Sequence, residues 1–172
     1  MKLWDKGYAT DAFVEEFTVG RDRELDLYLA EADVLGNMAH MKMLCSIGLL
    51  SAEDAVALEQ GLKEIYKQVQ RGEFVIEEGV EDVHSQVEFM LTERCGDVGK
   101  RIHTGRSRND QVMVDLKLFS RSAIIALQEG VEQLFSTLMA KAEEYKDVLM
   151  PGYTHQQVAM PSSFGMWLSA YA

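Results

Sequence analysis

Residues 101–112 read RIHTGRSRNDQV and stand directly before the longest helical pattern of the chain. The segment concentrates cations, hydroxyl groups, an amide and a glycine in a chain whose net charge is −11. A helix that begins near Asn109 or Asp110 has unpaired backbone N–H groups and a partial positive charge at its start, which favour a carboxylate or phosphate. Arg106 and Arg108 add forked donors that suit a carboxylate. The segment therefore predicts either a site for a small anionic ligand or a solvated, well-capped helix start.

The helical pattern beyond Asn109 continues to about Lys146. Its apolar positions are Leu116, Phe119, Ala123, Leu127, Leu134 and Leu138. A helix of about 37 residues spans roughly 55 Å, nearly twice the ~30 Å of a small domain. Its apolar stripe therefore predicts packing against further helices, from the same chain or from neighbouring copies.

Upstream of residue 101, the spacing of apolar residues predicts three further helices. The first runs from about Asp22 to Ile47, with a core face of Leu25, Leu29, Ala32, Leu35, Ala39, Met43 and Ile47. The second follows a capping box at Ser51 and Asp54, with a core face of Ala55, Leu58, Leu62, Ile65 and Val69. The third runs from about Asp82 to Cys95, with Val83, Val87, Met90 and Leu91 inward.

The remaining segments are less regular. Residues 1–20 are interpreted as an arm with one short helix around Asp11 to Phe17, and residues 73–80 as a loop, because a lone strand is marginal. Pro151 and Gly152 end the long helix, residues 153–157 form a polar loop, and Pro161 begins another helical pattern. The pattern predicts an all-α fold, with an N-terminal helical domain over residues 1–100 and the start of a long-helix central bundle over residues 101–172. Because the chain stops inside an apolar helical pattern, we expect it to be the front part of a longer protein.

Composition narrows the function classes. With 172 residues, 47% of them hydrophobic, the chain can form a packed core. Its acidic balance argues against nucleic acid and anionic membranes as partners, and no apolar run is long enough for a membrane span. Cys45 and Cys95 lack metal-like spacing, and the first residues lack the apolar core of a secretion signal. A cytoplasmic protein with reduced cysteines and small-molecule or protein partners is expected.

Two groups of residues could carry chemistry besides the opening segment. His155 is the best acid or base candidate, with Tyr153, Thr154 and Gln157 beside it to orient a polar ligand, although a loop histidine can also simply bond a backbone carbonyl. Glu81-Asp82-Val83-His84 is an acidic helix start in which Asp82 is a natural N-cap and His84 could face a polar cavity. The four histidines fall at no metal-binding spacing, so no metal is expected.

Three motifs together resemble the argininosuccinate lyase family of the fumarase/aspartase superfamily. They are the run from His103 to Gln111, the run from Pro151 to Pro161, and Glu81 to His84, in the family's order and at about its spacing. The resemblance implies a helical subunit in a homotetramer, active sites shared by three subunits, and reversible, cofactor-free cleavage of argininosuccinate into arginine and fumarate.

The resemblance also implies roles for individual residues. His155 matches the histidine usually assigned to the acid side of the elimination, or to a partner of the base. Ser107, Arg108, Asn109 and Thr154 match substrate contacts. Gln157 would support the loop, and Asp82 and His84 match a polar pair that lines the site.

The chain departs from the family pattern in several places. The family's Gly-Ser-Ser-x-Met-Pro loop, with the serine favoured as base and a substrate-binding lysine, is absent from these 172 residues. Residues 3–7 replace a Trp-Gly-Gly-Arg-Phe pattern, Asp22 stands where a substrate-contacting serine is expected, and Met160 stands where glutamine is usual. The chain alone is therefore expected to be inactive. The alternatives are a non-catalytic helical assembly or structural protein of the same family, and another superfamily lyase that forms fumarate.

Overall fold

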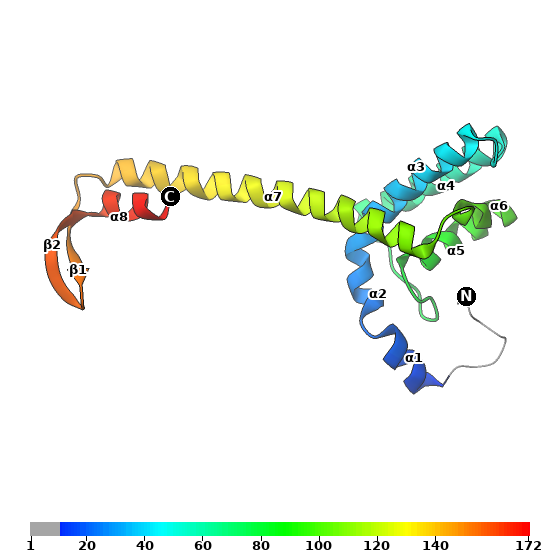
Figure 1. Cartoon of the computed structure of the whole chain (residues 1–172), viewed down its shortest axis with the longest axis horizontal. Helices are drawn as coiled ribbons and strands as arrows, with labels where there is room; N and C mark the ends of the chain where they lie inside the picture. Colours follow the sequence, from blue (N-terminus) through cyan, green and yellow to red (C-terminus); the bar gives the residue numbers. More distant parts are fainter. Residues whose placement is uncertain (1–10) are drawn as a thin grey trace. The chain divides into compact units, whose positions relative to one another are not determined.

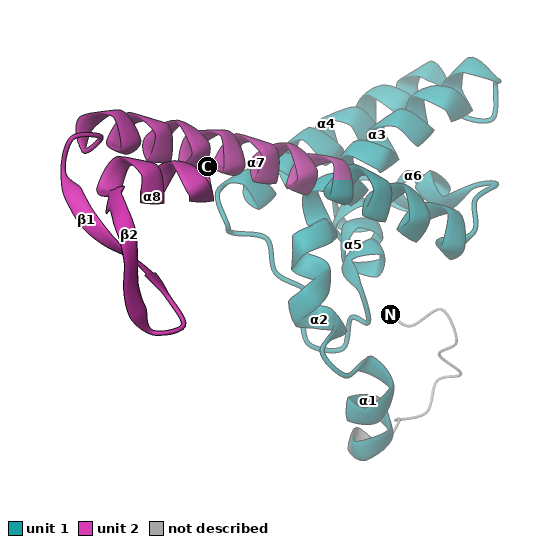
Figure 2. Cartoon of the chain, turned by 60° about the vertical axis from the view of Figure 1, so that its left-hand side comes forward, with its two compact units in different colours: residues 1–120 teal, residues 121–172 magenta. Residues whose placement is uncertain are grey.

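The computed structural model describes residues 11–172, which form two compact units (Figures 1 and 2). The first unit extends to Ser120 and the second comprises Arg121–Ala172, so the division falls within one long helix. The boundary expected near residue 100 stays a prediction. The departure at residues 3–7 lies outside the described residues. None of the helices in residues 11–172 is long and apolar enough to cross a membrane.

The described part of the first unit consists of helices joined by turns and loops. Its elements are α1 (Ala12–Val19), α2 (Asp22–Leu25), the 3-10 helix η1 (Asp26–Leu29), α3 (Ala30–Ser46), α4 (Ala52–Gln70), α5 (Val83–Cys95), α6 (Asp97–Lys100), the 3-10 helix η2 (Arg101–His103) and the first turns of α7 (Arg108–Glu144). The helices expected at residues 11–17, in α4, in α5 and in α7 are confirmed, and residues 73–80 form the expected loop. Side chains of Asp11, Ser51 and Asp82 cap the starts of α1, α4 and α5.

The core of this unit lies between α3, α4 and α5. Four of the five predicted core residues of α4 are buried, and Val69 packs against the core from a half-buried position. In α5, Val83, Val87 and Leu91 are at most 1% exposed. The apolar periodicity of α4 and α5 therefore predicted their buried faces correctly.

The prediction for residues 22–47 was wrong in two respects. The helix is not continuous, because η1 separates α2 from α3. The predicted core face is also largely exposed: Leu35 and Met43 are 41% exposed and Ile47 is 59% exposed. The residues that α3 buries are Ala30, Ala32, Asp33, Val34, Asn37, Met41 and Leu44. Asp33 and Asn37 are polar, so apolar periodicity places them on the solvent side of the helix. The predicted core face of α3 is therefore rotated away from the observed one.

The second unit holds the rest of α7, the antiparallel hairpin of β1 (Leu149–Thr154) and β2 (Gln157–Ser163), and α8 (Phe164–Tyr171). The hairpin corrects two predictions, because residues 153–157 are not a loop between helices and Pro161 does not begin a helix. Pro151 pairs with Pro161, and both are tolerated because each strand of a two-stranded sheet is an edge strand. Ser163 caps α8, accepting a hydrogen bond from Met166 N at 3.1 Å. The fold is otherwise all-α, as expected.

Candidate active site

The segment before α7 combines a tight turn with a capped helix start. Gly105 has a φ of 67°, a left-handed conformation that glycine adopts without strain. The Ser107 hydroxyl accepts from Asn109 N at 3.1 Å, and the Asp110 carboxylate accepts from Ser107 N at 2.9 Å. Ser107 and Asn109 are exposed. The well-capped start is therefore present, and it leaves the Asn109 side chain open to a ligand.

The two arginines of the segment have separate surroundings. Arg106 donates through Nη2 to Asn37 Oδ1 at 2.5 Å, and its Nε is buried without a partner among the described residues. Arg108 donates to Ser85 Oγ at 3.2 Å, and its Nε lies 3.5 Å from Asp82 Oδ2. Arg106 therefore belongs to an interior cluster, whereas Arg108 is half-buried beside the start of α5.

Asp82 has the capping role that its position predicts. Its Oδ1 accepts from Ser85 N at 2.7 Å, while its Oδ2 faces the Arg108 guanidinium. Asp82 and Arg108, which the sequence places 26 positions apart, are therefore neighbours at the starts of α5 and α7. A carboxylate that both caps a helix and faces a guanidinium can hold Arg108 in place for an anionic ligand.

Substitution of Asp82 separates these two roles. We expect Asp82→Ala to destabilise the fold by about 1 kcal/mol, because the N-cap is lost. Asp82→Asn retains a capping oxygen and should cost only a few tenths of a kcal/mol, although it removes the charge that faces Arg108. Urea unfolding of the two variants measures the difference, and equal losses would contradict the capping account.

His84 lies in a buried polar cluster that joins α3, α5 and α7. Its Nδ1 lies 2.8 Å from Asp33 Oδ1 and 3.5 Å from Asp115 Oδ2. Asp33 also accepts from Gln111 Nε2 at 2.5 Å and from Asn37 Nδ2 at 2.9 Å. All five residues are at most 4% exposed.

The charges of this cluster shift the pKa values of its members. Burial lowers the pKa of His84, but the hydrogen bond to Asp33 and the charge of that carboxylate outweigh burial, and the net shift is upward. Burial first, and then the charge of Asp33, raise the pKa of Asp115 to about 7. Atoms of Asp33, His84 and Asp115 lie within 4.8 Å of one another, a spacing that could suit a metal ion. Nδ1 of His84 lies 2.8 Å from Asp33 Oδ1, and when it donates a hydrogen bond to that carboxylate it has no lone pair to offer a metal.

Sequence reasoning found His84 but missed its partners. Asp33 and Asn37 are four positions apart on α3, and Gln111 and Asp115 are four positions apart on α7. Polar pairs at this spacing share one helix face, and their recurrence in two otherwise apolar patterns was a signal for a buried polar contact.

His155 occupies a strained turn in the second unit. Thr154 ends β1, Gln157 begins β2, and the two residues between them form the whole turn. His155 has a φ of 48° and Gln156 a φ of 63°, a left-handed pair typical of a type I′ turn, which glycine and asparagine usually fill. All four residues are exposed. The hairpin thus places the three predicted site residues of this unit side by side at its tip.

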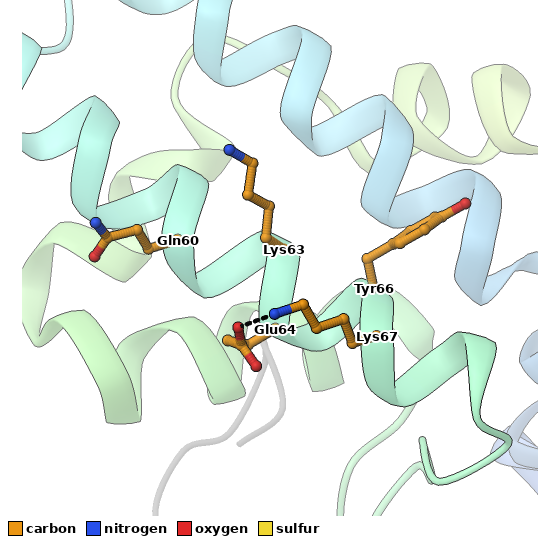
Figure 3. Close-up of a pocket in the computed structure, with 5 residues that line it drawn as sticks. All are labelled: Gln60, Lys63, Glu64, Tyr66 and Lys67. Atoms are coloured by element: carbon orange, nitrogen blue, oxygen red, sulfur yellow. Dashed lines mark hydrogen bonds and ion pairs between the residues drawn. The ribbon is translucent and has the colours of Figure 1, made fainter.

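A shallow pocket of about 430 Å³ lies on the surface of α4 (Figure 3). It is lined by Gln60, Lys63, Glu64, Tyr66 and Lys67. Its two lysines pair with carboxylates of the same helix, Lys67 with Glu64 at 2.7 Å and Lys63 with Glu59 at 3.1 Å. Because neighbouring side chains satisfy its charges, this pocket offers no group for the chemistry considered above.

Comparison with known proteins assigns the family. A family model described as lyase matches residues 6–172. The chain belongs to this lyase family. Curated argininosuccinate lyases of Bacteroides fragilis and Bacteroides thetaiotaomicron are each 66% identical to this lyase chain over 171 residues, which is 99% of its length and 38% of theirs. The resemblance deduced from the three motifs is confirmed, and the chain spans about 38% of the length of these relatives.

Solved structures agree with the fold of this lyase chain. A fumarate lyase:delta crystallin from Brucella melitensis superimposes with a TM-score of 0.74 at 15% identity, covering 95% of this chain and 41% of that one. At this identity the likeness shows a shared fold.

Proposed function

We propose that this chain supplies the N-terminal portion of an argininosuccinate lyase, which cleaves argininosuccinate reversibly into arginine and fumarate during arginine biosynthesis in the cytoplasm. The observation that carries the proposal is the 66% identity to curated argininosuccinate lyases over 99% of the chain. The match covers 99% of the chain and so spans the segments that hold the motifs around Asp82, Arg108 and His155. The whole enzyme's substrate and partners follow from the relatives and are part of the proposal.

The chemistry assigns the residues to two tasks. Elimination removes a proton beside a carboxylate and expels a guanidino nitrogen, which needs a proton as it leaves. Ser107, Arg108, Asn109 and Thr154 are proposed to hold the carboxylate end of the substrate, because helix-start donors and a guanidinium suit an anion. His155 is proposed to supply the leaving group's proton, or to assist the base.

Three other residues support these tasks. Gln157 begins β2 directly after the turn and is proposed to fix its geometry. Asp82 faces Arg108, and His84, two residues further along the chain, lies in the buried cluster, so both are proposed to line the site from the side of α5. The reaction is an acid–base elimination, and we propose that it proceeds without a cofactor or metal.

Assembly into a homotetramer with shared active sites is also proposed. Seven large apolar side chains of α7 within the second unit are 43–68% exposed in the single chain. They are Ile124, Ile125, Leu127, Val131, Leu134, Phe135 and Met139. Exposed apolar area of this extent on one helix is typical of a surface that another helix covers.

The test compares this chain with a full-length form that carries the serine loop. We expect the full-length protein to release fumarate from argininosuccinate and the 172-residue chain alone to release none. A full-length protein that forms fumarate only from a different amino-succinate substrate would reassign it to another lyase of the superfamily. One that assembles normally but gives no calorimetric heat with argininosuccinate or fumarate would favour a structural role.

A further inference from the structure

Asp115 is a fully buried carboxylate without a hydrogen-bond donor of its own. It is 0% exposed, and neither of its oxygens has a hydrogen-bond partner among the described residues. The Nδ1 of His84 is 3.5 Å from Oδ2, and that nitrogen already donates to Asp33 at 2.8 Å. On the other side, a Cβ added at Gly36 would lie 3.3 Å from Oδ1, so α3 packs closely against this carboxylate.

Asp33, in contrast, is well supplied with donors. Its Oδ1 accepts from His84 and Gln111, and its Oδ2 accepts from Asn37. An ionised carboxylate in a buried site is stabilised by such bonds and costs several kcal/mol without them. Two carboxylates that share one buried site do not both ionise readily, and the one with fewer donors keeps the proton.

Oxygens of Asp115 and Asp33 lie within 4.8 Å of each other. We propose that Asp115 is a neutral carboxylic acid that keeps its proton and donates a hydrogen bond to Asp33, and that the pair positions His84 with hydrogen on Nδ1, leaving Nε2 to face a ligand. Asp115 is therefore a positioning residue, which acts on the site through Asp33 and His84. The location of the proton follows from the cluster itself, whereas the use of Nε2 at an active site rests on the proposed function. The upward shift of the Asp115 pKa has the same cause.

Other charged groups surround the pair and bear on its protonation. Arg106, in the segment before α7, lowers the pKa of Asp115, but less than burial and Asp33 raise it. Asp82 and Arg108, at the starts of α5 and α7, act on His84 in opposite directions. The charge of His84 also lowers the pKa values of His103 and Asp26. His84 and, more weakly, Arg106 favour an ionised Asp115, and Arg106 also donates through Nη2 to Asn37.

The experiment follows the His84 ring by NMR in the full-length protein labelled with ¹³C at histidine Cε1. The His84→Gln variant assigns the signal, and the titration is compared in wild type, Asp115→Asn and Asp33→Asn. Asparagine at 115 is neutral and keeps a donor toward Asp33, so the His84 midpoint should stay at its wild-type pH. Asparagine at 33 removes the charge beside Nδ1 and should move the midpoint to lower pH.

The comparison between the two variants decides the proposal. A downward move in Asp115→Asn as large as that in Asp33→Asn would mean that Asp115 is ionised in the wild type, and would overturn the proposal.

Infrared spectroscopy of the wild type at pH 6 provides a second measurement that does not need the Asp115 variant to fold. Burial also raises the pKa of Asp26, which could give a similar band. A neutral-carboxyl band that persists in Asp26→Asn therefore supports the proposal, and its absence overturns it. A stoichiometric metal ion that is lost in Asp115→Asn would also overturn it. None of these results depends on lyase activity.

Discussion

His155→Asn is expected to lower kcat for argininosuccinate cleavage in the full-length enzyme by about 10²- to 10⁴-fold, the usual contribution of a positioned acid or base. The variant removes the imidazole from the hairpin tip and leaves the turn in place, because asparagine adopts positive φ more readily than most residues. Steady-state kinetics, with circular dichroism and subunit assembly as folding checks, measure the effect.

Gln156→Asn is the matched control. Gln156 is the other left-handed residue of the same turn, with a φ of 63°, so the same substitution tests the backbone without touching the imidazole. We expect its kcat to stay within about threefold of wild type, since asparagine suits the turn. Wild-type-like turnover in His155→Asn would remove the role proposed for His155. Equal losses in both variants would attribute the effect to the turn.

Gly99→Ala should destabilise the first unit by about 3 kcal/mol or more. A Cβ at this position of α6 would lie 2.4 Å from the backbone nitrogen of Thr92 and 2.6 Å from the carbonyl carbon of Leu91. Both atoms belong to the backbone of α5, which cannot move aside as a side chain can. Overpacking typically costs 1–3 kcal/mol and more where the neighbour is rigid. Urea unfolding and hydrogen exchange in α5 measure the loss.

Alanine substitutions at two other glycines should have smaller or opposite effects on stability and serve as controls for Gly99→Ala. A Cβ at Gly61 would meet the Cδ2 atom of Leu91 at 2.8 Å, and because that atom ends a flexible side chain, Gly61→Ala should cost about 1 kcal/mol. In the single chain that the structure describes, a Cβ at Gly130 of α7 would meet no atom within 4 Å, so Gly130→Ala in the 172-residue chain should stabilise the helix by about 0.5–1 kcal/mol. Similar effects at Gly99 and Gly61 would show that α6 can shift away from α5.

Local rules were sufficient for most of the helices. The apolar spacing of α4 and α5 identified their buried faces, the Ser51 and Asp82 caps marked their starts, and the long apolar pattern beyond Asn109 corresponds to α7. These features depend on residues within one or two helical turns of each other, so the sequence contains them. The three motifs, each contiguous in the chain, also identified the family.

Tertiary structure alone decided the hairpin, the buried face of α3 and the surroundings of His84. Pro151 and Pro161 are ten positions apart, and their pairing comes from the antiparallel register of two edge strands, which no local pattern specifies. Apolar periodicity places Asp33 and Asn37 on the outside of α3, whereas in the structure Asp33 meets Gln111 and Asp115 of α7 and accepts a hydrogen bond from Asn37. Polar residues can occupy a core only where distant donors and acceptors satisfy them, and that condition is met by three-dimensional contacts rather than by sequence neighbours.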